Sequence, residues 1–205
     1  MTEPYESPHE SGMKPEVRLD TARLRVLANP VRVNVLTLLR QRGPSTASRI
    51  AAELGINPGS ASYHLRRLAA GRLIVEEPDR GAGRERWWKS VHRQSIHDPA
   101  DEPADQRAAG RGYAHAVALA CAERLERAAQ EVPLLPEDWY EASFYSDFVL
   151  RLAPGDIERM RAELFEVVSR YRASESAAPA SSVPVSLQLQ AFPVPGTVEP
   201  GAWEA

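Results

Sequence analysis

The sequence predicts a mainly α-helical protein with a small amount of β-structure. Three observations lead to this prediction. Residues 45–73 show the pattern of two short helices joined by a tight turn and followed by a strand. A glycine-rich turn at 79–83 separates two strand-like runs, and an alanine-rich stretch from about 103 to 131 has helical spacing. With 205 residues, 43% of them hydrophobic, the chain is long enough for one domain with an extension, or for two small domains.

Composition excludes several classes of protein. The single cysteine, Cys121, excludes an internal disulfide and any multi-thiolate metal centre within one subunit. The first residues are polar and acidic and do not form a signal peptide. No apolar run approaches the ~20 residues needed to span a bilayer. We therefore expect a cytoplasmic protein with no membrane partner.

Charge is distributed unevenly along the chain. Residues 18–93 carry 15 Lys and Arg against 6 Asp and Glu, whereas residues 94–205 carry 9 against 18. A basic half beside an acidic half is typical of a DNA-binding head on a body that avoids phosphate. The alternative is charge scattered over two solvated surfaces.

The N-terminal part begins with a polar segment at 1–16, which we expect to be a disordered tail. Apolar spacing over 19–27 predicts a short helix. Asn29 and Pro30 then provide a cap and a first-turn proline for a helix to about Arg40, whose apolar residues make it central to the core. Gly43 and Pro44 end it.

Two further helices follow, joined by a tight turn. Ser45 or Thr46 can cap the first, and Gly55 ends it because glycine enters the left-handed conformation without a side-chain penalty. Asn57 and Pro58 provide the cap and first turn of the second helix.

The second helix has an apolar face of Ala61, Leu65 and Leu68. Its other faces are polar, as expected for a helix that lies in the major groove of DNA. His64 is open to two interpretations, a contact to phosphate or base and a packed position within the head. The polar residues are Ser60, Ser62, Tyr63, His64, Arg66 and Arg67.

A hairpin follows this helix. Residues 73–77 and 84–91 have the composition of strands, and the turn between them is glycine-rich. Arg80, Arg84 and Arg86 gather at its tip, where arginines commonly reach phosphates or a narrow minor groove. The alternative is a plain solvated hairpin.

The chain from about residue 18 to 93 resembles an ArsR-type winged helix-turn-helix transcriptional regulator. The matching features are Leu27 to Arg32 at the start of a helix, Ser60, His64, Leu65 and Leu68 in the second helix of the motif, and Gly71 to Ile74 before the hairpin. The resemblance implies double-stranded DNA as partner. The DNA-binding residues that we predict are Thr46, Asn57, Ser60, Ser62, Tyr63, His64, Arg66, Arg67, Arg80, Arg84 and Arg86.

The long helix after the hairpin has apolar residues spaced by three or four and many alanines. In the regulators that this chain resembles, the helix after the wing joins the first helix in a two-fold dimer interface. Two half-sites about one helical turn (~34 Å) apart also increase affinity and specificity. The alternative is a helix packed within its own subunit. The resemblance implies a homodimer held by Leu19, Leu24, Tyr113, Val117, Cys121 and Leu125.

The C-terminal part is predicted to form a small strand–helix–strand unit. Residues 144–152 and 183–191 alternate apolar and polar residues, and a helix with an apolar stripe starts at Pro154. Because two strands are not stable alone, we expect them to pack on the long helix or to pair with the other subunit. This part resembles, more weakly, the C-terminal extension of some actinobacterial ArsR-like regulators.

The sequence gives little indication of a metal site or of an enzyme active site. No cysteine lies in residues 50–54, where a thiolate site of the family would need one, and neither His115 with Glu123 nor His97 with Asp98 and Asp101 matches its ligand pattern. The sequence has no nucleophile elbow and no phosphate-binding glycine loop. We therefore predict no cofactor, no metal and no enzymatic activity.

The overall hypothesis is a dimeric, sequence-specific DNA-binding repressor. Its predicted parts are a tail (1–16), a winged head (17–95), a linker with a dimerisation helix (96–132), an accessory α/β unit (133–195) and a C-terminal tail (196–205). The alternative is a protein-interaction adaptor that uses the head as a scaffold. An unknown small-molecule effector would bind an aromatic pocket, although these residues are more often plain core: Trp139, Tyr140, Phe144, Tyr145 and Phe148.

Overall fold

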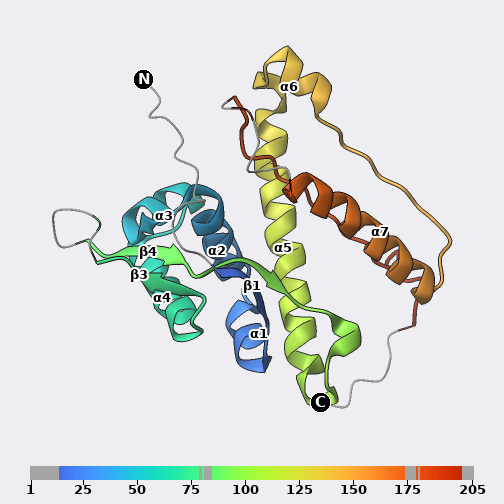
Figure 1. Ribbon diagram of the computed structural model, residues 1–205, viewed down its shortest axis with the longest axis horizontal. Coiled ribbons are helices and arrows are strands. Elements are labelled where there is room, and N and C mark those ends of the chain that lie inside the picture. Colours follow the sequence, from blue (N-terminus) through green and yellow to red (C-terminus); the bar gives the residue numbers. More distant parts are fainter. Residues whose placement is uncertain (1–13, 79, 81–84, 174–178, 180, 200–205) are drawn as a thin grey trace. The chain divides into compact units, whose positions relative to one another are not determined.

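The computed structural model describes residues 14–78, 80, 85–173, 179 and 181–199 (Figure 1). It divides into two compact units, one up to Leu134 and one from Leu135. The described part is mostly helical with two small sheets, as the sequence predicts. None of the described helices is long and apolar enough to cross a membrane.

Four helices form the N-terminal part of the first unit, and local capping signals set their limits. Asp20 and Asn29 each accept a hydrogen bond from the backbone N–H three residues ahead. α2 therefore starts where the sequence predicts, whereas α1 starts at Thr21, two residues later than predicted. Gly55 adopts the left-handed conformation (φ 63°) at the end of α3, and Asn57 then caps α4. The helices are α1 (Thr21–Leu27), α2 (Pro30–Arg42), α3 (Ala47–Leu54) and α4 (Pro58–Ala70).

The predicted hairpin is present as part of a three-stranded antiparallel sheet. Its strands are β2 (Ser45–Thr46), β3 (Ile74–Glu76) and β4 (Trp87–Ser90), in the order β2-β4-β3. Both hairpin strands are shorter than predicted. Arg84, at the tip, lies outside the described residues.

A second sheet pairs two segments that the sequence did not assign to strands. β1 (Lys14–Arg18) runs parallel to β5 (His92–Ile96), although we expected a disordered tail to residue 16 and a linker from residue 96. The guanidinium of Arg40 on α2 donates hydrogen bonds to the carbonyl of His92 (2.9 Å) and to Oγ of Ser95 (2.9 Å). Burial lowers the pKa of Arg40 to about 10, so it keeps its charge at neutral pH. This contact fixes β5 on α2.

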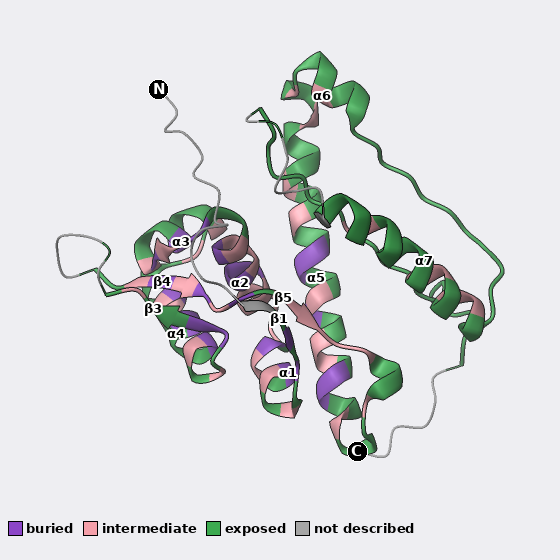
Figure 2. Cartoon of the chain, viewed as in Figure 1, coloured by how far each residue is buried: buried purple, intermediate pink, exposed green. Residues whose placement is uncertain are grey.

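The hydrophobic core lies among the four helices and the three-stranded sheet (Figure 2). Its largest fully buried side chains include Leu24, Leu39, Ile50, Leu65 and Leu68. The apolar residues that the sequence analysis assigned to the core on α2 and α4 are therefore the ones that pack.

The long helix α5 (Arg107–Glu131) contacts α1 and α2 through a face of small residues. Gly110 gives room to the carboxylate of Glu102, which a side chain at that position would displace. Short 3-10 turns lie at Pro99–Asp101 and Ala104–Gln106 before this helix and at Val132–Leu134 after it.

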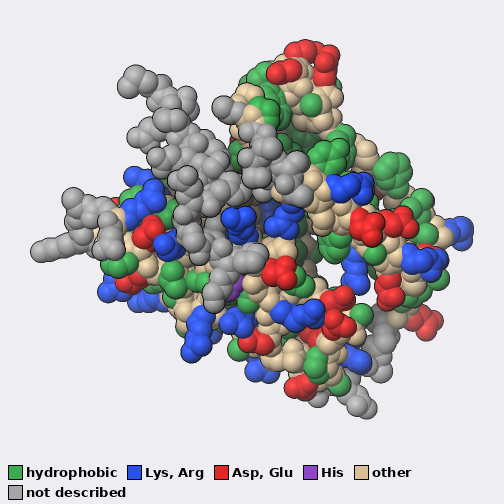
Figure 3. Space-filling model, in the orientation of Figure 1, with side chains coloured by type: hydrophobic (Ala, Val, Ile, Leu, Met, Phe, Trp, Pro, Cys, Tyr) green, Lys and Arg blue, Asp and Glu red, His purple; other side chains and the backbone are tan. Residues whose placement is uncertain are grey.

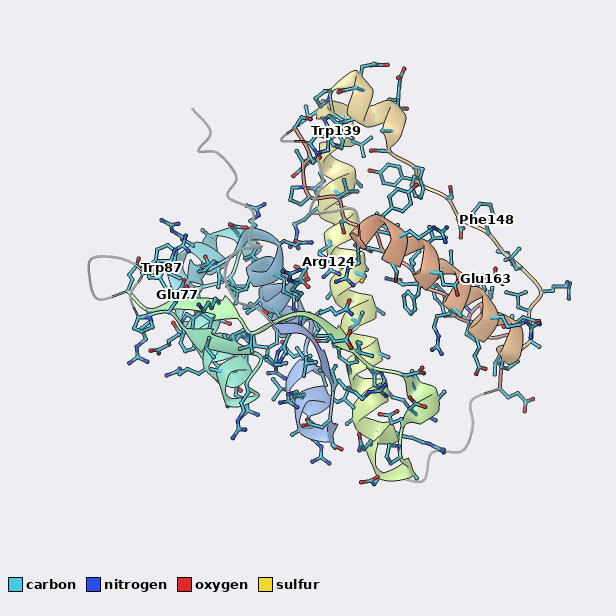
Figure 4. The ribbon with its side chains drawn as sticks, in the orientation of Figure 1. Glu77, Trp87, Arg124, Trp139, Phe148 and Glu163 are labelled. Atoms are coloured by element: carbon cyan, nitrogen blue, oxygen red, sulfur yellow. The ribbon has the colours of Figure 1, made fainter. Side chains whose placement is uncertain are left out.

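A polar cluster joins α5 to α2. Asn34 donates to the carboxylate of Glu123 (2.6 Å) and accepts from the guanidinium of Arg124 (2.7 Å), which also donates to Sγ of Cys121 (3.1 Å) (Figure 4). Each polar group of this part-buried cluster therefore has a partner, which offsets the cost of burying it.

The second unit contains α6 (Glu137–Ala142) and α7 (Pro154–Ala173). The helix predicted from Pro154 is confirmed, but the strands predicted at 144–152 and 183–191 were wrong, because the structure has no strand in either segment. Alternation predicts which side chains share a face but does not provide a neighbouring strand. No described residue of this unit is buried (Figure 2).

Candidate nucleic-acid interface

The outer face of α4 presents an aromatic ring and two cations to solvent. Tyr63 is 50% exposed, and both Arg66 and Arg67 are exposed, while Ser60 and Ser62 are half-buried at its edge. The opposite face packs Leu65 and Leu68 into the core. One side of α4 therefore packs on the core, and the other side is exposed and can enter a DNA groove.

The start of α4 combines a cap with an open surface. Oδ1 of Asn57 accepts a hydrogen bond from the N–H of Ser60 (2.7 Å), and Pro58 and Gly59 beside it are exposed. In helix-turn-helix proteins, the N-terminal residues of this helix contact base edges. The side-chain oxygen of Asn57 accepts the capping hydrogen bond, and its amide nitrogen can donate a further one.

Two predicted DNA contacts lie away from this surface. Thr46 is 1% exposed and accepts the capping hydrogen bond from the N–H of Arg49. His64 is 9% exposed, and its ring meets that of Tyr63 edge to face. Its packed position follows from its spacing, since it falls three residues after buried Ala61 on the same stripe.

The environment of His64 also disfavours its charged form. Burial lowers the pKa of His64, and the nearby cation of Arg32 lowers it further. A neutral, buried imidazole does not provide a charge for phosphate. Of the two interpretations of His64, the structure therefore supports packing within the head.

A tryptophan on the hairpin holds two cations. The guanidinium of Arg49 on α3 lies 4.8 Å from the centre of a Trp87 ring, and that of Arg80 lies 5.3 Å from it. Such distances are within the range of a cation–π interaction. The sequence predicted Arg80 but missed Arg49. The alignment of Thr46 with Trp87 across the sheet brings Arg49 near the ring, and no local signal reveals that pairing.

The cations of the hairpin also form ion pairs within the chain. Arg86 contacts the carboxylate of Glu76 (3.1 Å), and Glu77 pairs with Lys89 (2.9 Å) and Arg80 (3.7 Å) (Figure 4). The Arg86–Glu76 pair is exposed, and exposed pairs contribute little to stability. The ion pairs do neutralise two carboxylates that would otherwise repel phosphate.

Lys and Arg side chains are numerous on the visible surface of the first unit around α4 (Figure 3). The residues that form the candidate interface are Asn57, Ser60, Ser62, Tyr63, Arg66 and Arg67 on α4, Arg49 on α3, and Arg80, Arg86 and Trp87 on the hairpin. We refer to this set as the cationic face.

The residues predicted for dimerisation lie in different environments. Leu19, Leu24 and Cys121 are buried within the chain itself, whereas Tyr113 and Val117 are half-buried and Leu125 is 50% exposed. Only the last three leave surface for a second subunit. The first three pack the core that supports α5.

The aromatic residues predicted for an effector pocket do not gather around a described cavity. Trp139 is half-buried, while Tyr140, Phe144, Tyr145 and Phe148 are 55–77% exposed. An open groove of about 310 Å³ lies elsewhere, in the first unit, between β1, β5 and the turns before α5.

The histidine and acid pairs considered for a metal do not converge. His97 lies 3.3 Å from a carboxylate oxygen of Glu102, and its ring meets Tyr113 edge to face. Among the residues that the structure describes, no group of three or more His, Cys, Asp or Glu could hold a metal ion.

Comparison with known families identifies the class of this head. Residues 27–77 match the model of a helix-turn-helix domain family. Together with the three-stranded sheet, this makes the head a winged helix-turn-helix domain. A comparison with curated proteins finds no match.

Several solved structures align over most of the chain with low identity. One is an apo mutant of ZitR from Lactococcus lactis, at 16% identity, 69% of this chain, 83% of that chain and TM-score 0.30. Another is RV1404 from Mycobacterium tuberculosis, at 15% identity, 76% and 82% coverage and TM-score 0.30. A third is NMB1585, a MarR family regulator from Neisseria meningitidis, at 16% identity, 72% and 78% coverage and TM-score 0.27.

Proposed function

We propose that this protein is a sequence-specific DNA-binding transcriptional regulator of ArsR type that acts as a homodimeric repressor in the cytoplasm. The observation that supports the proposal most directly is the exposed outer face of α4, which presents Tyr63, Arg66 and Arg67 to solvent. The cations of Arg49 and Arg80 on the Trp87 ring add to it. Phosphate contacts from such cations position a protein on DNA, and side chains of the groove helix read the bases.

The proposal assigns a role to each part of the cationic face. Tyr63 and the serines of α4 meet base edges, and Arg66 and Arg67 meet the flanking phosphates. Arg80 and Arg86 on the hairpin reach the backbone or the minor groove. Dimerisation through the exposed stripe of α5 that includes Leu125 repeats the contacts in a second half-site.

The experiment is selection of bound fragments from genomic DNA by the full chain, followed by footprinting of the enriched sequence. Specific binding predicts a protected site with two related halves, and a reporter placed behind that site should fall in expression when the protein is present. No enrichment, together with no binding to any duplex at low salt, would contradict the proposal and favour a protein-interaction adaptor.

Two variants distinguish specific binding through the cationic face from general electrostatic attraction to DNA. Tyr63→Ala should reduce binding to the selected site far more than binding to random DNA, because it removes a contact in the groove. Arg107→Ala changes an exposed cation at the start of α5, outside the cationic face, and should leave both affinities unchanged.

A further inference from the structure

The second unit exposes nearly all of its large hydrophobic side chains. Phe144, Phe148 and Val149 are 75–79% exposed, and Val185 and Phe192 are 75% and 69% exposed. Figure 3 shows hydrophobic side chains on the visible surface of this unit, and Figure 4 shows Phe148 on the segment before α7. Soluble proteins rarely expose apolar surface on this scale unless it is covered by a partner.

Two segments of this unit have the pattern of strands but no strand partner. In residues 144–152 the apolar side chains of Phe144, Phe148, Leu150 and Leu152 share one face, and in residues 183–191 alternate residues are apolar. The structure assigns no strand to either segment. Such segments need both backbone pairing and cover for their apolar face.

The charges of the first segment indicate which partner fits. Asp147 and Arg151 both lie on its other face, two residues to either side of Val149. Two copies of one segment related by a two-fold axis run antiparallel. With the axis at Val149, Asp147 lies opposite Arg151 of the second copy, and Phe148 lies opposite Leu150 of the second copy.

We propose that residues 144–152 pair antiparallel with the same residues of a second copy of this chain, with Val149 on the two-fold axis. The pairing satisfies both backbones and forms two cross-strand ion pairs. It also joins the apolar faces of the two copies into one surface, which the apolar stripes of α7 cover. Residues 183–191, which have no charged residue, flank the central pair.

The charge balance of the unit disfavours nucleic acid as the partner. Residues 135–205 contain 11 Asp and Glu against 5 Lys and Arg. Within one chain, Asp147 and Arg151 lie about 13 Å apart along an extended segment, too far for an ion pair. In the proposed register, each of them instead lies opposite the other charge on the second copy.

Disulfide trapping in the full chain tests this register. Val149→Cys, in a Cys121→Ser background, places two thiols opposite each other, at a Cβ separation of about 5 Å. Tyr145→Cys is the matched control, because the two copies of that position would lie about 26 Å apart. Under mild oxidation we expect a covalent dimer from Val149→Cys and essentially none from Tyr145→Cys. Equal yields from the two variants, or no dimer from Val149→Cys, would overturn the proposal.

Charge reversal tests the proposed pairing of Asp147 with Arg151 of the second copy, again through the rate of disulfide trapping. In the Val149→Cys chain, Asp147→Arg or Arg151→Asp alone places like charges opposite each other and should slow dimer trapping about tenfold. The two substitutions together restore opposite charges and should restore the rate. Failure of the double variant to recover would contradict the proposed register. Because trapping is measured without DNA, its outcome is separate from that of the DNA-binding proposal.

Discussion

The guanidinium of Arg49 lies 4.8 Å from the centre of a Trp87 ring, although 38 positions separate these residues in the sequence. The contact joins the first helix of the helix-turn-helix to the wing. Arg80 approaches a ring of the same tryptophan at 5.3 Å. Trp87 is therefore the aromatic platform for two cations of the proposed DNA surface.

The first prediction concerns this platform. Trp87→Leu should lower DNA affinity about fivefold, because each exposed cation–π contact contributes about 0.5–1 kcal/mol to holding a cation in place. Fluorescence anisotropy with a labelled duplex measures the change. Trp87→Phe keeps an aromatic face and should lose less affinity, and equal losses in the two variants would argue against a role for the ring.

The second prediction concerns Arg67, which is exposed on the outer face of α4. Arg67→Ala should weaken binding to all DNA sequences and reduce the slope of log K against log salt by about 0.9, the value for one phosphate contact. Titrations at several salt concentrations give the slope. An unchanged slope would refute the phosphate contact, and Arg107→Ala serves as the control.

The third prediction concerns the space that Gly110 leaves for Glu102. Gly110→Ala should destabilise the fold by about 1 kcal/mol, because the carboxylate must leave its site beside His97 and lose that contact. In a Glu102→Ala background the obstruction is gone. In that background, Gly110→Ala should stabilise the fold by about 1 kcal/mol, since alanine favours a helix more than glycine.

Urea unfolding of the four chains measures both values. A sign that does not change between the two backgrounds would contradict this explanation of the glycine.

The fourth prediction concerns pH. Because burial and the cation of Arg32 lower the pKa of His64, the unfolded chain binds the proton first as pH falls. The free energy of unfolding should therefore decrease as pH falls below about 6.5, the ordinary value for histidine. Urea unfolding at pH 7.5 and 5.5 should show a larger decrease in the native chain than in His64→Gln. Equal decreases would show that His64 is not responsible.

The sequence predicted best what is determined locally. Asn29, Gly55 and Asn57 mark helix ends through bonds to neighbours a few positions away, and α2, α3 and α4 end or begin at them. The burial of His64 was also open to prediction, because the stripe of Ala61, Leu65 and Leu68 includes it.

Contacts between distant segments were harder to predict. Nothing in residues 14–18 indicates that they pair with residues 92–96, and the position of Arg49 depends on the register of β2 with β4. At the C-terminus, alternation predicted strands at 144–152 and 183–191, and the structure has no strand in either segment. The periodicity of a sequence predicts which side chains share a face. Strand pairing depends in addition on whether another strand lies beside the segment.

The ion pairs of the hairpin between β3 and β4, the wing, affect how strongly DNA binding should depend on salt. Arg86 and Arg80 already hold the carboxylates of Glu76 and Glu77, so a phosphate group must replace an internal anion to bind them. Such an exchange leaves Glu76 to recruit mobile cations from solution, whereas Glu77 keeps its ion pair with Lys89. When the hairpin binds DNA, fewer ions should consequently be released than its number of arginines implies. The salt dependence of DNA affinity should arise mainly from the arginines of α4.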